Sequence, residues 1–202
     1  MTITHLTPAM QPVVPWKNGL GSTRQVAVDP PGAGAGDPFR WRVSLATVGQ
    51  DGPFSRFPGV DRTLWLARGA GMTLQIEGQE RALRHAWEAV SFPGEAAVEG
   101  RLVDGPTLDL NLMHDRARVR CHHTLLRLRA REAWASRVAT AGQDLLLLLE
   151  GSLQVTSPTQ GRFQLQPGDA LRLDEGPAGR GWALVAGPDP VAALLASFRI
   201  TP

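Results

Sequence analysis

Apolar and polar residues alternate with a period of two along much of this chain, which is typical of strands with one buried face. The alternation covers residues 39–48, 63–67, 72–77, 107–113, 124–129 and 153–156. An unbroken apolar run at 145–149 is typical of a strand covered on both faces. Only 131–139 and 191–197 have a helix-like pattern, and the second fits a strand equally well. The pattern predicts an all-β protein.

Glycine and proline interrupt the chain often enough to exclude most long helices. There are 22 Gly and 16 Pro among 202 residues, so short strands joined by turns are expected. Hydrophobic residues make up 43% of the chain and charged residues 20%, which is sufficient for a buried core. This length allows one large β domain or two fused smaller ones.

A weak internal repeat favours two copies of one β unit. Gly69 is followed by Leu-Gln-Ile at 74–76, and Gly151 is followed by Leu-Gln-Val at 153–155. In each copy a second strand follows after a turn, and in the second copy that turn contains Pro-Gly-Asp at 167–169. We therefore expect an N-terminal unit of residues 1–116 and a C-terminal unit of residues 117–202.

The charge pattern excludes some classes of partner. Lys and Arg number 21 against 19 Asp and Glu, and the basic residues are scattered, so neither nucleic acid nor a membrane is indicated. A single cysteine, Cys121, excludes an internal disulfide. The first residues lack the pattern of a signal peptide, so a cytoplasmic location is expected.

Polar chemistry is densest in the first half, beginning with a glycine-rich segment at 15–24. Trp16 can form an apolar wall, and Lys17 and Arg24 can neutralise an anion beside the amide of Asn18. The glycines allow backbone N–H groups to approach a ligand closely. The alternative is an ordinary surface turn with exposed charges.

Two alternating strands carry further polar groups. In the first, Trp41 shares an apolar face while Arg42 and Ser44 lie on the other face, which is either a binding surface or simply exposed. In the second, Asp109 and Asn111 lie opposite three leucines. We expect this pair to point into a barrel that holds a polar ligand, although a solvent-exposed edge strand would look the same.

The segment at 51–62 is rich in aromatic and charged residues. Phe54 can pack the loop against the core, and Asp61 and Arg62 can form ion pairs or contact a ligand. A structural lid and a binding element are equally consistent with this composition.

The histidines do not form a pattern typical of a metal site. The five are His5, His85, His114, His122 and His123, and no His-x-His pair occurs. His122 and His123 would point to opposite faces of a strand. We therefore expect no metal and no other cofactor. The second half offers only leucines beside its Pro-Gly-Asp turn, and it is interpreted as a scaffold.

Four blocks occur in an order that resembles the HutD/Ves family. They are PWKNGLGSTR (15–24), FRWRVSLA (39–46), DGPFSRFPGVDR (51–62) and DLNLM (109–113). The resemblance implies a bicupin, that is, two fused cupin-like β-barrels or jelly rolls packed as one compact unit. It also implies a bacterial cytoplasmic protein connected, in its HutD branch, with histidine utilisation. No settled enzymatic reaction comes with the family.

The leading expectation is a protein that binds a small carboxylate such as formylglutamate or urocanate and that can form a homodimer. The ligand-binding residues expected are Trp16, Lys17, Asn18, Arg24, Trp41, Arg42, Ser44, Phe54, Asp61, Arg62, Asp109 and Asn111. One alternative is a metal-independent isomerase or hydrolase that uses Asp109 or Asp61 as a base. Others are a Ves-like stress-related protein without catalysis and an interaction protein with a vestigial pocket.

Overall fold

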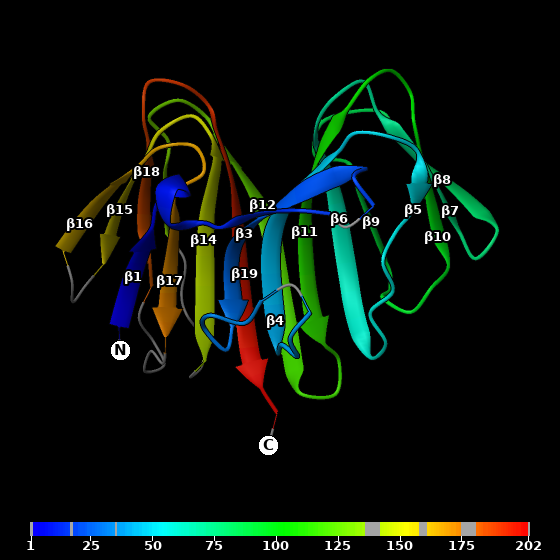
Figure 1. The fold of residues 1–202 in the computed structure, drawn as a ribbon. Coiled ribbons are helices and arrows are strands. Elements are labelled where there is room, and N and C mark those ends of the chain that lie inside the picture. Colours follow the sequence, from blue (N-terminus) through cyan, green and yellow to red (C-terminus); the bar gives the residue numbers. More distant parts are fainter. Residues whose placement is uncertain are drawn as a thin grey trace. The chain divides into compact units, whose positions relative to one another are not determined.

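A computed structural model describes residues 2–16, 18–34, 36–135, 142–157, 161–174 and 181–201. Regular structure in these ranges is β apart from one short 3-10 turn, η1 (Pro8–Met10), which confirms the all-β prediction (Figure 1). The chain forms two compact units. One is Gln11–Val119, and the other combines Met1–Met10 with Arg120–Pro202.

The N-terminal unit consists of two antiparallel sheets. The six-stranded sheet has the order β2 (Val13–Pro15), β3 (Gly21–Asp29), β4 (Trp41–Val48), β11 (Thr107–Asp115), β6 (Val60–Arg68) and β9 (Ala89–Pro93). The four-stranded sheet has the order β5 (Gly52–Pro53), β10 (Val98–Leu102), β7 (Met72–Ile76) and β8 (Gln79–Leu83). One hydrophobic cluster joins Leu64 and Leu66 of the first sheet to Met72 and Leu74 of the second. The two sheets therefore enclose a common core.

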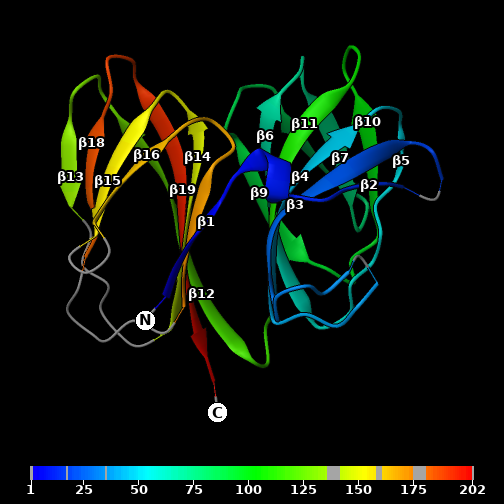
Figure 2. The ribbon, with the colours of Figure 1, turned by 60° about the vertical axis from the view of Figure 1, so that its left-hand side comes forward.

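The C-terminal unit has the same two-sheet construction. Its five-stranded sheet has the order β1 (Thr2–Leu6), β17 (Ala170–Asp174), β14 (Gln143–Glu150), β19 (Val191–Ile200) and β12 (Val119–Leu128). Its four-stranded sheet has the order β13 (Ala133–Ala135), β18 (Ala183–Ala186), β15 (Leu153–Ser157) and β16 (Gly161–Leu165) (Figure 2). The leucines of β14 are buried on both faces of the strand, as the unbroken apolar run predicts.

The strand orders show the internal repeat directly. The sheets β4-β11-β6-β9 and β5-β10-β7-β8 correspond to β12-β19-β14-β17 and β13-β18-β15-β16. Gly69 and Gly151 mark equivalent turns, with φ angles of 113° and 78°. A Cβ at these positions would lie 2.9 Å from the Pro106 carbonyl and 2.5 Å from the Pro190 carbonyl, respectively. Both copies therefore require glycine at this turn, for its backbone conformation and for close packing.

The structure places strands in the described parts of both helix-like segments, and it divides the two units slightly differently from the expected boundary. Residues 191–197 belong to strand β19, and 133–135 form β13, while 136–139 lie outside the described residues. Helical periodicity is not informative for β19, because its alanines and leucines are buried on both faces. The first ten residues belong to the C-terminal unit because β1 pairs with β17, and the units divide after Val119 instead of after residue 116.

We predict that Leu146→Ala lowers the free energy of unfolding by about 2–5 kcal/mol, because Leu146 is fully buried and its truncation leaves a cavity. Urea titration followed by far-ultraviolet circular dichroism measures the change. Val185→Ala in the same unit is the control, since Val185 is 41% exposed and should change stability by less than about 0.5 kcal/mol. Equal effects of the two substitutions would contradict the assignment of Leu146 to the core.

Candidate functional site

A strip of polar side chains lies on the inner face of the six-stranded sheet of the N-terminal unit. Its members are Arg42 and Ser44 on β4, Asp109 and Asn111 on β11, and Arg62 on β6. The strand register places these residues on the same side as Leu64 and Leu66, which belong to the core cluster. All five polar residues are buried. The inward orientation expected for Asp109 and Asn111 is therefore observed.

Arg62 and Asn111 form the central contact of the strip. The guanidinium of Arg62 donates through Nε at 2.9 Å and through Nη2 at 2.6 Å, both to Oδ1 of Asn111. A guanidinium can only donate, so this contact fixes the amide with its Nδ2 donors directed to the other side. Within the described ranges, no carboxylate forms an ion pair with Arg62.

Aromatic rings flank the Arg62 guanidinium. Its Cζ atom lies 5.0 Å from the ring centroid of Phe54 and 5.3 Å from that of Phe92, which are cation–π distances. Burial lowers the pKa of Arg62 to about 10, and the nearby Asp109 carboxyl opposes this shift. Arg62 therefore remains a cation at neutral pH although water has largely been removed from it.

Asp109 lies on the same face of β11, two residues before Asn111, with an exposed fraction of 0%. Neither of its carboxylate oxygens has a hydrogen-bond partner among the residues that the structure describes. Burial raises the pKa of Asp109 to about 7, while the Thr107 hydroxyl and the charge of Arg62 act in the opposite direction. The Thr107 hydroxyl influences the carboxyl without making a hydrogen bond of normal geometry, since Thr107 Oγ1 is also unpartnered within the described residues.

Arg42 has a structural contact at one end of the strip. Its Nη2 donates to the Gly34 carbonyl at 2.6 Å, and its Cζ lies 4.3 Å from the Phe39 ring centroid. Burial lowers the pKa of Arg42, and Asp37 raises it. Gln25 donates to the Ala33 carbonyl at 3.0 Å. Arg42 and Gln25 together hold the loop between β3 and β4 against this end of the sheet.

The glycine-rich segment reaches the core through Trp16. Its Nε1 donates to the Thr23 hydroxyl at 2.8 Å, and its side chain packs against the hydrophobic cluster. A Cβ at Gly21 would lie 2.2 Å from the Thr47 carbonyl and 3.1 Å from the Trp16 ring. Asn18 is exposed and accepts the backbone N–H of Leu20 within a turn. Lys17 lies outside the described residues.

Three of the expected site residues lie on the opposite face of the six-stranded sheet. Trp41 alternates with Arg42, and Arg24 is opposite Leu45, so both point away from the polar strip. Asp61 is bound to Arg116 at 2.8 Å and lies 3.8 Å from His114. The structure thus brings together Arg42, Ser44, Phe54, Arg62, Asp109 and Asn111 and places Arg24, Trp41 and Asp61 elsewhere.

Phe92 and Thr107 contact the site without having been identified as candidates. Phe92 is opposite Arg62 in the pairing of β6 with β9. No local sequence feature indicates which distant strand supplies the second ring. Thr107 lies two residues before Asp109 and therefore on the same face of the strand. This period-two spacing is the signal that could have identified it.

The interior of the C-terminal unit differs at the corresponding positions. If Gly69 and Gly151 are equivalent, Leu66 corresponds to Leu148 and Leu64 to Leu146. Their partners on β19 are then Ala193 and Leu195, in place of Asp109 and Asn111. These side chains belong to or pack against a hydrophobic cluster. The same equivalence places the buried Asp144 at the position of Arg62, with Ser197 donating to its carboxylate.

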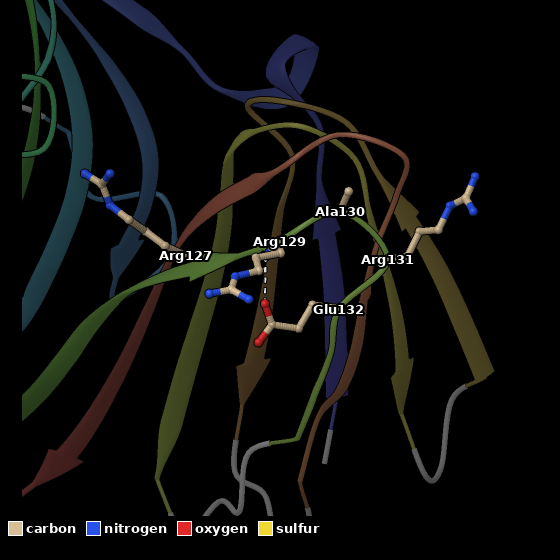
Figure 3. Close-up of a pocket in the computed structure, with 5 residues that line it drawn as sticks. All are labelled: Arg127, Arg129, Ala130, Arg131 and Glu132. Atoms are coloured by element: carbon tan, nitrogen blue, oxygen red, sulfur yellow. Dashed lines mark hydrogen bonds between the residues drawn. The ribbon is translucent and has the colours of Figure 1, made fainter.

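The C-terminal unit has a surface hollow of about 530 Å³, lined by Arg127, Arg129, Ala130, Arg131 and Glu132. Figure 3 shows that the Arg131 side chain points away from those of Arg127 and Arg129. The Glu132 carboxylate accepts the backbone N–H of Arg129 at 2.7 Å. Because the guanidinium groups do not converge on one point, this hollow is a weaker binding candidate than the polar strip.

The described residues contain neither a cluster that could hold a metal ion nor a helix that could cross a membrane. No group of three or more His, Cys, Asp or Glu side chains there could hold a metal ion. No helix there is long and apolar enough to cross a membrane.

Comparison with known proteins places these features in a family. The HutD family model matches residues 9–187. An uncharacterized 21.2 kDa protein in the hutC 3′ region of Pseudomonas putida is 33% identical over 168 residues, covering 81% of this chain and 82% of the relative. Protein Ves of Cronobacter sakazakii is 33% identical over 170 residues, covering 80% of this chain and 87% of the relative.

Solved structures agree with this family assignment. HutD from Pseudomonas fluorescens has a TM-score of 0.79 at 29% identity, with 100% of both chains covered. A cupin 2 conserved barrel domain protein from Leptotrichia buccalis has a TM-score of 0.56 at 12% identity, covering 93% of this chain and 89% of that protein. The second similarity shows the fold alone, and it confirms the cupin-like architecture.

The position of Asp109 predicts a pH-dependent effect on stability. The folded-state pKa of about 7 lies above the ordinary value of 3.8, so the stability contribution is fully present below the unfolded-state pKa and is lost as the pH rises through about 7. Asp109→Asn removes this loss. We expect the variant to be more stable than the wild type by ~2–4 kcal/mol near pH 8, with a difference that disappears toward about pH 4.

Urea unfolding at both pH values measures the difference. Asp104→Asn is the control, because Asp104 is exposed and its substitution should change stability equally at the two pH values. An Asp109→Asn effect that does not depend on pH would contradict the expected titration.

Proposed function

This chain belongs to the HutD family, and we propose that it binds a small carboxylated metabolite at Arg62 in the interior of its N-terminal unit. The observation that carries the proposal is the state of the Arg62 guanidinium. It is buried, it donates to the neutral amide of Asn111, and no described carboxylate pairs with it. A buried cation without an ion-pair contact is costly, and a bound anion would offset that cost.

The groups around Arg62 suit a carboxylate. Asn111 directs its Nδ2 donors away from Arg62, so the amide can donate to an anion while its Oδ1 holds the guanidinium. The rings of Phe54 and Phe92 provide apolar walls beside the charge. Few polar groups among apolar walls are typical of small-molecule sites.

The family connection suggests which carboxylate is involved. The relative from Pseudomonas putida is named for the hutC 3′ region, and the similar protein from Pseudomonas fluorescens is named HutD. We propose a ligand of histidine utilisation in the cytoplasm, with N-formylglutamate and urocanate as the first compounds to test.

A second candidate function is a metal-independent isomerase or hydrolase. The observation that favours it is Asp109, since a pKa of about 7 suits general acid–base catalysis near neutral pH. Turnover of N-formylglutamate or urocanate that is lost in Asp109→Asn would establish the enzyme instead.

We predict that Arg62→Gln weakens binding of the carboxylate roughly 10- to 100-fold, the value of a charged hydrogen bond. Isothermal titration calorimetry with N-formylglutamate, urocanate and histidine measures it. Arg68→Gln is the control, because Arg68 is an exposed cation on the same strand and its loss should leave the Kd unchanged. Absence of heat with all three compounds at millimolar concentration, or equal effects of the two variants, would refute binding at Arg62.

A further inference from the structure

Asp109 lies behind the proposed anion site without a hydrogen-bond partner among the described residues, and binding at Arg62 does not use it. We propose that Asp109 makes ligand binding proton-linked, so that the anion binding at Arg62 enters together with one proton held on the Asp109 carboxyl. The inference rests on the proposed function and adds the charge state of the site to it.

Asp109 and Asn111 lie close together on the inner face of β11. They are two residues apart, so they are separated by roughly 7 Å along the strand. Asn111 holds Arg62 through two hydrogen bonds. A carboxylate bound beside Arg62 would therefore lie on the same buried face as the Asp109 carboxyl, whose charge acts on Arg62.

Few of the described side chains that face Asp109 carry a charge. Arg62 on β6 and Arg42 on β4 are the cations of this face, and Asp37 partly balances Arg42. The neighbouring strands β3, β9, β7 and β10 contribute the uncharged side chains of Thr23, Gln25, Phe92, Met72, Leu74 and Val98. On β8 the corresponding side carries Leu83 in the core and an exposed Arg81 at the sheet edge.

The Asp109 carboxylate and a ligand carboxylate would compete for the positive charge of Arg62. When Asp109 is ionised, Arg62 is the cation whose charge stabilises it. A ligand carboxylate at Arg62 would then face a like charge in a low-dielectric interior, which favours protonation of one of the two. Asp109 is the group that takes the proton, because burial already raises its pKa to about 7.

The consequence is a site whose affinity depends on pH. Below about pH 7 Asp109 is neutral and Arg62 acts as a free cation toward the ligand. Above that pH, each increase of one pH unit should weaken ligand binding about tenfold, until the pH reaches the pKa of Asp109 in the ligand-bound protein. No metal and no movement of the backbone is needed for this coupling.

Calorimetric titration in buffers of different ionisation enthalpy tests the inference. N-formylglutamate and formate are the probes, because neither titrates between about pH 6 and pH 9, whereas urocanate carries an imidazole that does. In phosphate and Tris near pH 8 we expect the measured heats to differ by the uptake of up to about one proton per ligand. Asp109→Asn should remove this uptake and give a Kd that is constant from about pH 6 to pH 9.

Asp144→Asn is the matched control. Asp144 is also a buried carboxyl with a raised pKa, but it belongs to the C-terminal unit, so this variant should retain the proton uptake of the wild type. Binding by the wild type without proton uptake, or uptake that persists in Asp109→Asn, overturns the inference and leaves the proposed function intact. Failure of both probes to bind at any pH overturns both. If Asp109→Asn does not fold, the proton count of the wild type across the pH range decides.

Discussion

The pairing of the Arg62 guanidinium with the Asn111 amide is the interaction on which the interior of the N-terminal unit depends. It holds a full positive charge on the face of a sheet whose other inward positions include Leu64 and Leu66. An aliphatic side chain in place of Arg62 would complete an ordinary core. Retaining a cation there requires an acceptor and flanking rings, and Asn111, Phe54 and Phe92 supply both.

The two units of the chain share one architecture, but the groups that hold the buried Arg62 cation are found in the N-terminal unit. The two units share the same order of eight strands, and each has a glycine with positive φ at the equivalent turn, Gly69 and Gly151. In the C-terminal copy, Ala193 and Leu195 fill the positions of Asp109 and Asn111 with aliphatic side chains. The same fold thus carries aliphatic side chains at two positions in one unit where the other unit has an acid and an amide.

Much of the fold could be predicted from the sequence because period-two alternation and glycine-rich turns are local signals. The site could be predicted only in part. Alternation shows that Trp41 and Arg42 lie on opposite faces but not which face is inside, and in β4 both faces are buried. The same ambiguity affects Asp61 and Arg62, which are neighbours in sequence and belong to different environments. Pairings between distant strands, such as that of Phe92 with Arg62, leave no local trace.

The charges of the polar strip do not play equivalent parts. Arg42 is held by the Gly34 carbonyl, the Phe39 ring and the nearby Asp37, so its charge is used within the unit. Arg62 and Asp109 remain, and neither completes a conventional ion pair with the other among the described residues. A buried cation and a buried carboxyl whose charges act on each other form a pair whose net charge is set by one proton. The anion affinity of this interior is therefore a property of Arg62 and Asp109 together. A sequence comparison based on Arg62 alone would not include the effect of the Asp109 protonation state.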